Sequence, residues 1–254
     1  MSFEDYKLET IGKRGFSEIF KGTKEGSQDC FIVKRLKKDY LFEGAFNVIV
    51  EGLQALKDVN HSNIIKLLEI KEDSNYYYCR CEYFYGENFF DYLKKRESKI
   101  LSEEIVQYIM KQLISAIKYL HDKKIVHRNI KPSTIYINYG TKNDLLDKNI
   151  LNSKIILAGF EVSTHLKKGE SLNLPLGTKN YMAPEISKKM EYNEKVDIWS
   201  LGVIFCELLK NLSKEASSFL DCMLQEDPNK RKTAEELLEQ DFIVKDIKDF
   251  HKNI

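Results

Sequence analysis

Hydrophobic and polar positions alternate along residues 3–36, around several glycines, with the two-residue period of antiparallel strands. The same period returns over residues 64–83, and shorter strand-like runs follow at 135–138 and 154–157. Residues 42–59 and 102–122 instead carry apolar side chains every three or four positions, which predicts helices. Ser102 is placed to cap the second helix. A strand-rich first third and a helix-rich remainder predict an α+β protein with two lobes.

Composition and charge narrow the classes of function. A chain of 254 residues with 43% hydrophobic content is long enough for one large domain or two small lobes. The net charge of +1 gives no general attraction to nucleic acid or to a membrane surface. No apolar run is long enough to cross a bilayer, and the N-terminus does not have the form of a signal peptide. We therefore expect a cytoplasmic protein, with a cytoskeletal or other large complex as one setting, and neither a nucleic-acid partner nor membrane insertion.

The five cysteines show no C-x-x-C spacing, so we expect reduced cysteines and no metal site.

Short motifs follow one another over nearly the whole chain: residues 11–19 with Gly12 and Gly15, Lys34, residues 127–134, residues 177–185, residues 197–202 and residues 227–231. Their order resembles that of the protein kinase superfamily, and within it the serine/threonine kinases. The resemblance implies, in turn, a glycine-rich loop, a strand lysine that pairs phosphates, a catalytic loop, the end of an activation segment and two C-lobe motifs.

The resemblance implies a two-lobed, protein-kinase-like fold for residues 1–254. A small antiparallel sheet with helix C forms the N-lobe (1–83), a hinge follows (83–87), and the C-lobe (88–254) is mostly helical. The family's helix G region has no counterpart, because only Asn211 and Leu212 separate the expected helix F from the expected helix H.

The residues retained from the family pattern are mostly architectural. The resemblance implies that Asp197 holds the backbone of the catalytic loop, next to His127 and Arg128, and that Glu185 pairs with Arg231 inside the C-lobe. Such residues support the fold without supplying chemistry.

The altered residues are mostly chemical. The family's catalytic base, an Asp, is Asn129, and its magnesium-binding Asn is Thr134. Aligning residues 153–160 with the strand and D-F-G motif places Leu157 at the second magnesium ligand, an Asp in the family. Leucine offers no oxygen to a hard cation.

The helix C pattern places the partner of Lys34 at Gly52, while Glu51 lies one residue earlier and about 100° around the helix. Which of the two residues faces Lys34 is left open by the sequence.

A nucleotide pocket remains on the family pattern. Its candidate lining residues are Lys34, Gly12, Gly15, Cys81, Tyr83 and Val33. Without metal ligands, we expect no required cofactor and at most ATP bound without magnesium, in a pocket that Leu157 partly fills.

These losses predict a pseudokinase: not an enzyme, but a scaffold, structural subunit or allosteric partner that binds another protein. Two alternatives are a magnesium-independent nucleotide-binding module and a weak residual Ser/Thr kinase. A rewired transferase that holds metal through Glu161 finds no second carboxylate at suitable spacing.

Four surface features have open alternatives. The missing helix G region either bares apolar side chains for a partner or is closed over by its neighbours. Residues 139–153 form a long connection whose apolar pairs, Leu145-Leu146 and Ile150-Leu151, either cap a neighbouring surface or fold back as a short helix. An apolar stripe of the C-terminal helix packs on its own lobe or in a partner groove; it comprises Ile243, Ile247, Phe250 and Ile254. Hydroxyls near the activation segment are candidates for phosphorylation with Arg128 as receiver: Ser163, Thr164, Ser171 and Thr178.

Overall fold

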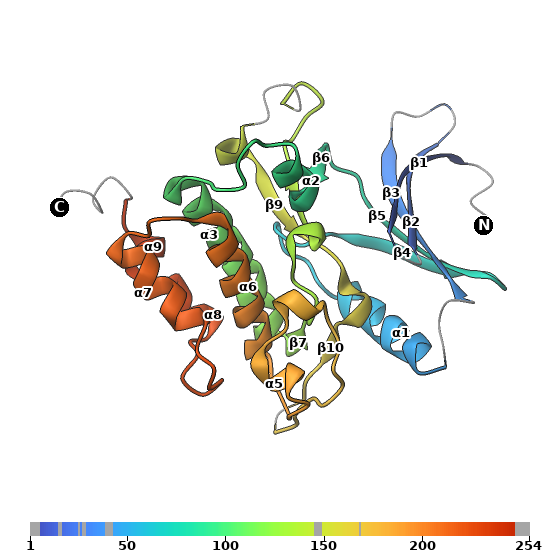
Figure 1. Ribbon diagram of the computed structural model, residues 1–254. Helices are drawn as coiled ribbons and strands as arrows, with labels where there is room; N and C mark the ends of the chain where they lie inside the picture. Colours follow the sequence, from blue (N-terminus) through green and yellow to red (C-terminus); the bar gives the residue numbers. More distant parts are fainter. Residues whose placement is uncertain are drawn as a thin grey trace.

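The computed structural model describes residues 6–14, 17–24, 26, 29–38, 43–144, 149–167 and 169–246. It has two lobes, with a β-sheet and one helix on one side and a mostly helical body on the other (Figure 1). This is the predicted kinase-like α+β arrangement. Gly15, Leu145-Leu146, Ile247, Phe250 and Ile254, named above, lie outside the described residues.

The N-lobe is a five-stranded antiparallel sheet in the order β1-β2-β3-β5-β4. The strands are β1 (Tyr6–Arg14), β2 (Ser17–Lys24), β3 (Cys30–Lys37), β4 (Leu67–Glu72) and β5 (Tyr76–Glu82). Helix α1 (Glu43–Lys57) packs against one face through Ile49 and Leu53, which contact Leu36.

The register of β3 decides which residues face the interlobe side. Lys34 pairs with Cys79, and Ile32 pairs with Cys81, so these four side chains share one face of the sheet. Val33 lies on the opposite face, where it packs with Phe20 and Phe31. The prediction that Val33 lines the nucleotide pocket is therefore wrong, because side chains alternate along a strand.

The C-lobe begins at the strand β6 and ends in short helices. Its elements are β6 (Gly86–Asn88), α2 (Phe89–Lys94), α3 (Glu103–Asp122), β7 (Ile125–Val126), η3 (Pro132–Thr134), β8 (Ile135–Asn138), η4 (Ile150–Asn152), β9 (Lys154–Leu157), η5 (Phe160–Val162), β10 (Thr164–His165), η6 (Lys179–Tyr181), α5 (Pro184–Ser187), α6 (Lys195–Leu208), α7 (Lys214–Met223), α8 (Ala234–Leu238) and α9 (Asp241–Val244). Strands β6, β8 and β9 form one small sheet, and β7 and β10 form another.

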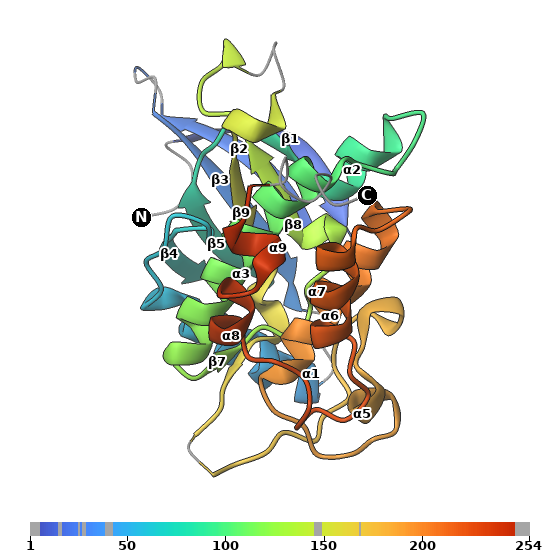
Figure 2. The ribbon, with the colours of Figure 1, turned by 90° about the vertical axis from the view of Figure 1, so that its left-hand side faces the viewer.

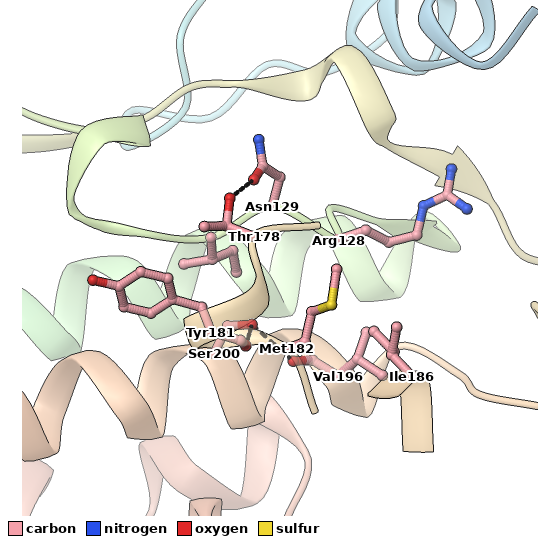
Figure 3. Close-up of a pocket in the computed structure, with 9 residues that line it drawn as sticks. Arg128, Asn129, Thr178, Tyr181, Met182, Ile186, Val196 and Ser200 are labelled. Atoms are coloured by element: carbon pink, nitrogen blue, oxygen red, sulfur yellow. Dashed lines mark hydrogen bonds between the residues drawn. The ribbon is translucent and has the colours of Figure 1, made fainter. Parts of the chain in front are cut away.

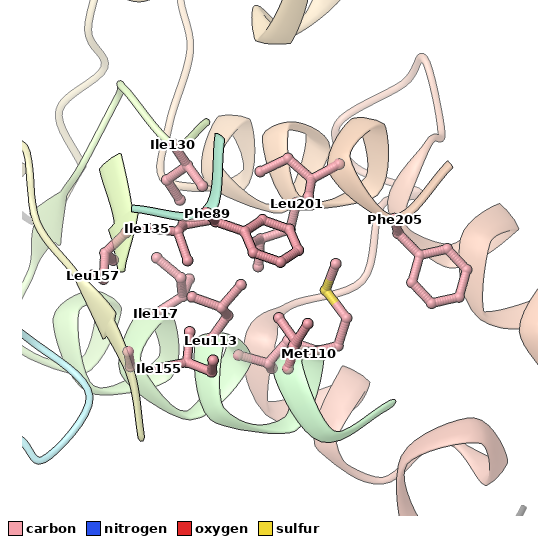
Figure 4. Packing of buried hydrophobic residues seen from close by; sticks show 14 of the residues in the cluster. Phe89, Met110, Leu113, Ile117, Ile130, Ile135, Ile155, Leu157, Leu201 and Phe205 are labelled. Carbon is pink, nitrogen blue, oxygen red and sulfur yellow. The ribbon is translucent and has the colours of Figure 1, made fainter. Parts of the chain in front are cut away.

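Helix α3 follows from its sequence. Its N-terminus is capped by Ser102, whose Oγ accepts the Ile105 N–H at 3.4 Å. Its apolar stripe is buried, and the main core forms around Leu113 and Ile117 together with Leu201 of α6 (Figure 4). None of the described helices is long and apolar enough to cross a membrane.

The gap at the family's helix G is closed by neighbouring helices. Helix α6 ends at Leu208, the chain turns through Asn211 (φ 53°), and α7 begins at Lys214. Helices α6, α7 and α9 lie side by side (Figure 2). Phe205, Phe219 and Phe242, one from each helix, pack with ring centroids 5.2–5.4 Å apart. Leu208 and Leu209, where α6 ends, are therefore buried, whereas Val244 of α9 stays 59% exposed.

Two further alternatives are settled in part. Ile243 of the expected C-terminal stripe is buried against its own lobe. In the 139–153 connection, Ile150 is buried in η4, and Leu151 packs partly against the same core. The described part of this connection therefore folds back onto the C-lobe.

A buried ion pair links α5 to the C-terminal part of the lobe. Arg231 donates through Nη1 to Glu185 Oε1 at 2.7 Å and through Nη2 to Oε2 at 3.1 Å. The Arg231 side chain is fully buried, and its guanidinium also lies 5.2 Å from the centre of the Trp199 ring. Because neither charge is solvated, each depends on the other.

We expect Glu185→Ala to lower the free energy of unfolding by about 3–5 kcal/mol, because it leaves Arg231 buried without its counter-charge. Urea denaturation followed by the fluorescence of Trp199, the single tryptophan, measures this change. Glu226→Ala is the matched control, because it removes a glutamate whose ion pair with Lys188, at 3.8 Å, is exposed to solvent on both sides. It should change stability by no more than about 0.5 kcal/mol. Equal midpoints for the two variants would contradict the expectation.

Candidate functional site

The catalytic-loop backbone is held by Asp197, in the first turn of α6. Its Oδ1 accepts the Arg128 N–H and its Oδ2 accepts the His127 N–H, each at 2.9 Å. His121 Nε2 of α3 lies 3.0 Å from Oδ2. Burial alone would raise the pKa of Asp197, but His121 and the other donors outweigh it and lower the pKa. An ionised, fully buried carboxylate therefore fixes the loop, including Arg128 at φ 64°.

His127 connects the loop to the segment after β9. Its Nδ1 accepts the Asn129 N–H at 3.2 Å, and its Nε2 donates to the Ala158 carbonyl at 3.0 Å. Burial lowers the pKa of His127, so the ring is neutral. The ring meets Phe160 edge-on, with centroids 4.7 Å apart.

The position of the family's magnesium-binding Asp is occupied by Gly159. In the family this Asp and the catalytic-loop Asn hold the same ions, so the two side chains must be neighbours. Thr134 stands at the Asn position, and its Cγ2 lies 2.5 Å from where a Cβ on Gly159 would be. The segment Gly159-Phe160-Glu161 therefore corresponds to D-F-G.

The prediction that Leu157 occupies the position of this Asp is wrong, because that position lies two residues later, at Gly159. Leu157 is fully buried in the core near Ile117 and Ile135, in β9 (Figure 4). It does not project into the phosphate region. The sequence alignment was anchored on the glycine of the motif, whereas the retained residue is the phenylalanine, Phe160, packed on His127.

At the catalytic-base position, the Asn129 amide is engaged by the activation segment. Thr178 donates its hydroxyl to Asn129 Oδ1 at 3.0 Å (Figure 3). Lys131 Nζ in turn donates to Thr178 Oγ1 at 2.7 Å. The pocket beside them, with a volume of about 10 Å³, has room for one water at most. An amide oxygen is not a base at neutral pH, so this side chain orients a hydroxyl without accepting its proton.

Thr134 uses its hydroxyl inside the loop. Thr134 Oγ1 lies 3.0 Å from the carbonyls of Asn129 and Lys131, to which it can donate, and it accepts the Lys131 N–H at 3.1 Å. It therefore closes the η3 turn in place of a metal-binding amide.

Lys34 forms an ion pair with Glu161 of η5. Burial alone would lower the pKa of Lys34, but the Glu161 charge outweighs it and raises the pKa. Burial alone would likewise raise the pKa of Glu161, and Lys34 lowers it. Both groups therefore stay charged in a partly buried site.

Neither of the two candidate partners on α1 faces Lys34. Glu51 Oε1 accepts the hydroxyl of Thr164 in β10. Gly52 lies against η5, so close that a Cβ would be 2.1 Å from the Phe160 carbonyl oxygen. The family's Glu on helix C and Gly of D-F-G are thus exchanged: position 52 is the glycine and position 161 the glutamate.

The remaining pocket candidates are only partly gathered. Cys81 lies on the same face as Lys34, and burial raises the pKa of its thiol to about 12, so it stays protonated. Tyr83, directly after β5, packs against Tyr85, and Lys21 Nζ lies 5.1 Å from the centre of its ring. Gly12 in β1 pairs with Ile19 in β2, and Ile19 in turn pairs with Lys34 in β3.

Arg128 does not face an open phosphate site. Its Nε donates to the Val162 carbonyl at 2.5 Å, and its side chain points away from Asn129 (Figure 3). The hydroxyls of Ser163 and Thr164 are buried, whereas Ser171 is exposed and donates to Glu191 at 2.7 Å. Buried hydroxyls are poor acceptors of a phosphate, so Ser163 and Thr164 lose support as regulatory sites.

Comparisons with known proteins point to one family. The family model "Protein kinase domain" matches residues 6–211, and its match ends where the chain passes directly from α6 to α7. The chain is 33% identical over 209 residues to the Serine/threonine-protein kinase TIO of Arabidopsis thaliana, covering 82% of this chain and 15% of that protein. It is 31% identical over 255 aligned positions to the Probable serine/threonine-protein kinase pXi of Dictyostelium discoideum, covering 92% of this chain and 35% of that protein. The chain thus spans a minor part of the length of these relatives.

The prediction that the chain is not an enzyme is wrong on these findings. A protein kinase domain is present, and the relatives are named serine/threonine-protein kinases, which points to an enzyme. The prediction rested on the altered side chains at the family positions 129, 134, 157 and 52, and it set Glu161 aside because the sequence showed no second carboxylate near it.

We expect Gly52→Ala to destabilise the fold by about 1–3 kcal/mol, because the new methyl group would overlap the Phe160 carbonyl. Helix propensity alone predicts the opposite sign, a gain of about 1 kcal/mol. Chemical denaturation of the variant and the wild type decides between the two. Gly12→Ala is the control, since its Cβ would meet only Ile19 at 4.0 Å and should be nearly neutral. A stabilised Gly52→Ala would show that α1 and η5 are not in close contact.

Proposed function

The chain belongs to the protein kinase family, and we therefore propose that it is a serine/threonine-kinase domain with weak phosphotransfer, which acts chiefly as a scaffold or allosteric partner of another protein. The serine/threonine specificity is carried over from the names of the relatives. Because the chain spans only part of those relatives, the activity of the whole protein is included in this proposal.

The observation that carries the weak transfer is the state of Asn129. Its amide oxygen accepts from Thr178, and it cannot take the proton of an acceptor hydroxyl. Loss of a general base typically costs 10²–10⁴ in rate. Kinases turn over at roughly 1–100 s⁻¹. The remaining turnover should therefore lie well below that of the family. Thr134 and Gly159 replace the family's magnesium-binding Asn and Asp, which lowers the turnover further.

Two observations support the protein-binding role. The framework around the loop is complete, since Asp197 and the Glu185–Arg231 pair are in place. The activation-segment side also exposes apolar side chains. Leu174 and Met190 are 51% and 56% exposed, on the two segments that the Leu172–Tyr192 backbone pairing joins. An apolar surface of this kind favours a protein partner.

Nucleotide binding is the second candidate function, because Lys34 is held charged on the interlobe face of the sheet. ATP is the expected ligand, and a cytoplasmic location and the absence of a nucleic-acid partner stay predictions from the sequence.

We expect Asn129→Asp to raise phosphotransfer by about 10²-fold, the lower end of a general-base effect, because it restores a basic oxygen next to the Thr178 hydroxyl. Transfer of radiolabel from ATP to a mixed Ser/Thr peptide library measures it, with Lys34→Met as the background. Asn60→Asp is the control, since it adds the same charge at an exposed position outside the site. The proposal of weak transfer fails if wild-type transfer does not exceed the Lys34→Met background, or if it already reaches the family's ordinary rate.

The partner role has its own measurement. Native extracts are separated by size, and the protein is expected to run with another protein in a stable complex. A species that runs only as a monomer would count against the scaffold.

A further inference from the structure

We propose that Glu161 is the divalent-cation ligand of this domain, and that its carboxylate replaces the magnesium-binding aspartate that is absent at Gly159. The inference rests on the proposed kinase function and names the residue through which the nucleotide's cation is held.

The first observation is the place of the carboxylate. Glu161 Oε2 lies 3.9 Å from where a Cβ on Gly159 would be. The carboxylate oxygens of an aspartate lie two bonds beyond its own Cβ. The Glu161 carboxylate therefore lies beside the Cβ position of an aspartate at 159, although it comes from two residues further along the chain. Thr134 Cγ2, 2.5 Å from the same position, is the other neighbour there.

The second observation is how the two oxygens are used. Oε1 bonds Lys34 Nζ, and Oε2 is the oxygen nearest the Gly159 position. A carboxylate has about four lone-pair sites, so one oxygen can hold the lysine while the other accepts a cation. In the family two carboxylates perform these tasks, one on helix C and one in D-F-G.

The third observation is that the backbone carrying Glu161 is fixed on both sides. Phe160 packs on His127, and the η5 backbone lies directly against Gly52 of α1. The close approach is possible only because position 52 has no side chain. A ligand on a fixed backbone needs little rearrangement when it binds.

The donor set fits a cation that arrives with the nucleotide. Among the described residues, no three His, Cys, Asp or Glu side chains gather into a group able to hold a metal ion by themselves. Magnesium is commonly bound through one or two carboxylates together with the phosphates of the substrate. One carboxylate at Glu161, with Lys34 beside it for the phosphates, meets that requirement for a Mg²⁺·nucleoside triphosphate. When bound, the ion would neutralise charge on the phosphates.

The test is the magnesium dependence of nucleotide affinity, which is independent of phosphotransfer. The dissociation constant of ATP is measured by calorimetry with Mg²⁺ and with EDTA, and the ratio of the two constants is compared between variants. We expect a ratio of about tenfold or more for the wild type, falling to near one in Glu161→Gln. Glu170→Gln, which removes an exposed glutamate, is the charge-matched control and should keep the wild-type ratio.

Lys34→Met separates ligation from positioning. If Glu161 acted only by holding Lys34, then Glu161→Gln would weaken binding equally with and without Mg²⁺. We expect Lys34→Met to weaken binding under both conditions and to keep the ratio, and Glu161→Gln to lose the ratio. In a titration with Mn²⁺·ATP, free Mn²⁺ is followed by its electron paramagnetic resonance signal. We expect metal-dependent binding in the wild type and in Lys34→Met, and its loss in Glu161→Gln.

Glu161→Gln leaves Lys34 without its partner, so folding is checked by circular dichroism. If this variant does not fold, Lys34→Met is compared with Lys34→Met/Glu161→Gln, in which both charges are absent; only the double variant should lose the ratio. The inference is overturned if wild-type protein binds no ATP at millimolar concentration, if magnesium leaves its affinity unchanged, or if the ratio survives the loss of Glu161. Weak transfer without that magnesium dependence would overturn only this inference, whereas magnesium-dependent binding without any transfer would count only against the proposed function.

Discussion

The buried carboxylate of Asp197 is the fixed point on which the site depends. It joins three parts of the C-lobe: its own helix α6, His121 of α3, and the backbone of the catalytic loop. Within the loop, His127 donates to the Ala158 carbonyl and packs against Phe160, so the loop in turn positions these two residues. The position of η5, and with it the position of Glu161, therefore follows from a charge deep in the helical lobe. A fully buried carboxylate persists only because each of its oxygens is hydrogen-bonded.

Lys34 keeps a glutamate as its partner, but this glutamate stands at a different position in the chain than in the family. The family places a glutamate on helix C and a glycine in the D-F-G segment, and here the two residue types have changed places. Lys34 keeps an acidic partner, but the partner now comes from the segment that follows β9. The exchange is coupled, because the close contact between Gly52 and the Phe160 carbonyl leaves no room for a side chain at position 52. A glutamate restored at position 52 alone would therefore not fit.

Much of the fold was predictable from the sequence, because it depends on local period. The apolar stripe and Ser102 cap of α3, and the alternation of β3 and β5, specify elements that the structure shows at nearly the expected residues. The shortened connection after α6 was also visible as two residues between helical patterns. Its consequence was not, because the closing of the gap depends on Phe205, Phe219 and Phe242 meeting from three separate helices.

The site was less predictable, because its contacts join residues far apart in the chain. The apolar run through Leu157 and Ala158 gives no local signal of where the D-F-G register falls. The contacts of Gly159 with Thr134 and of Phe160 with His127 fix it. Likewise, a lone Glu161 carries no sign of its partner, 127 positions away. The pairing of Lys34 with Glu161 has one consequence for motion. It joins β3 of the N-lobe to η5 of the C-lobe instead of to α1 of the N-lobe. Opening of the two lobes about the hinge therefore requires that the Lys34–Glu161 ion pair separates.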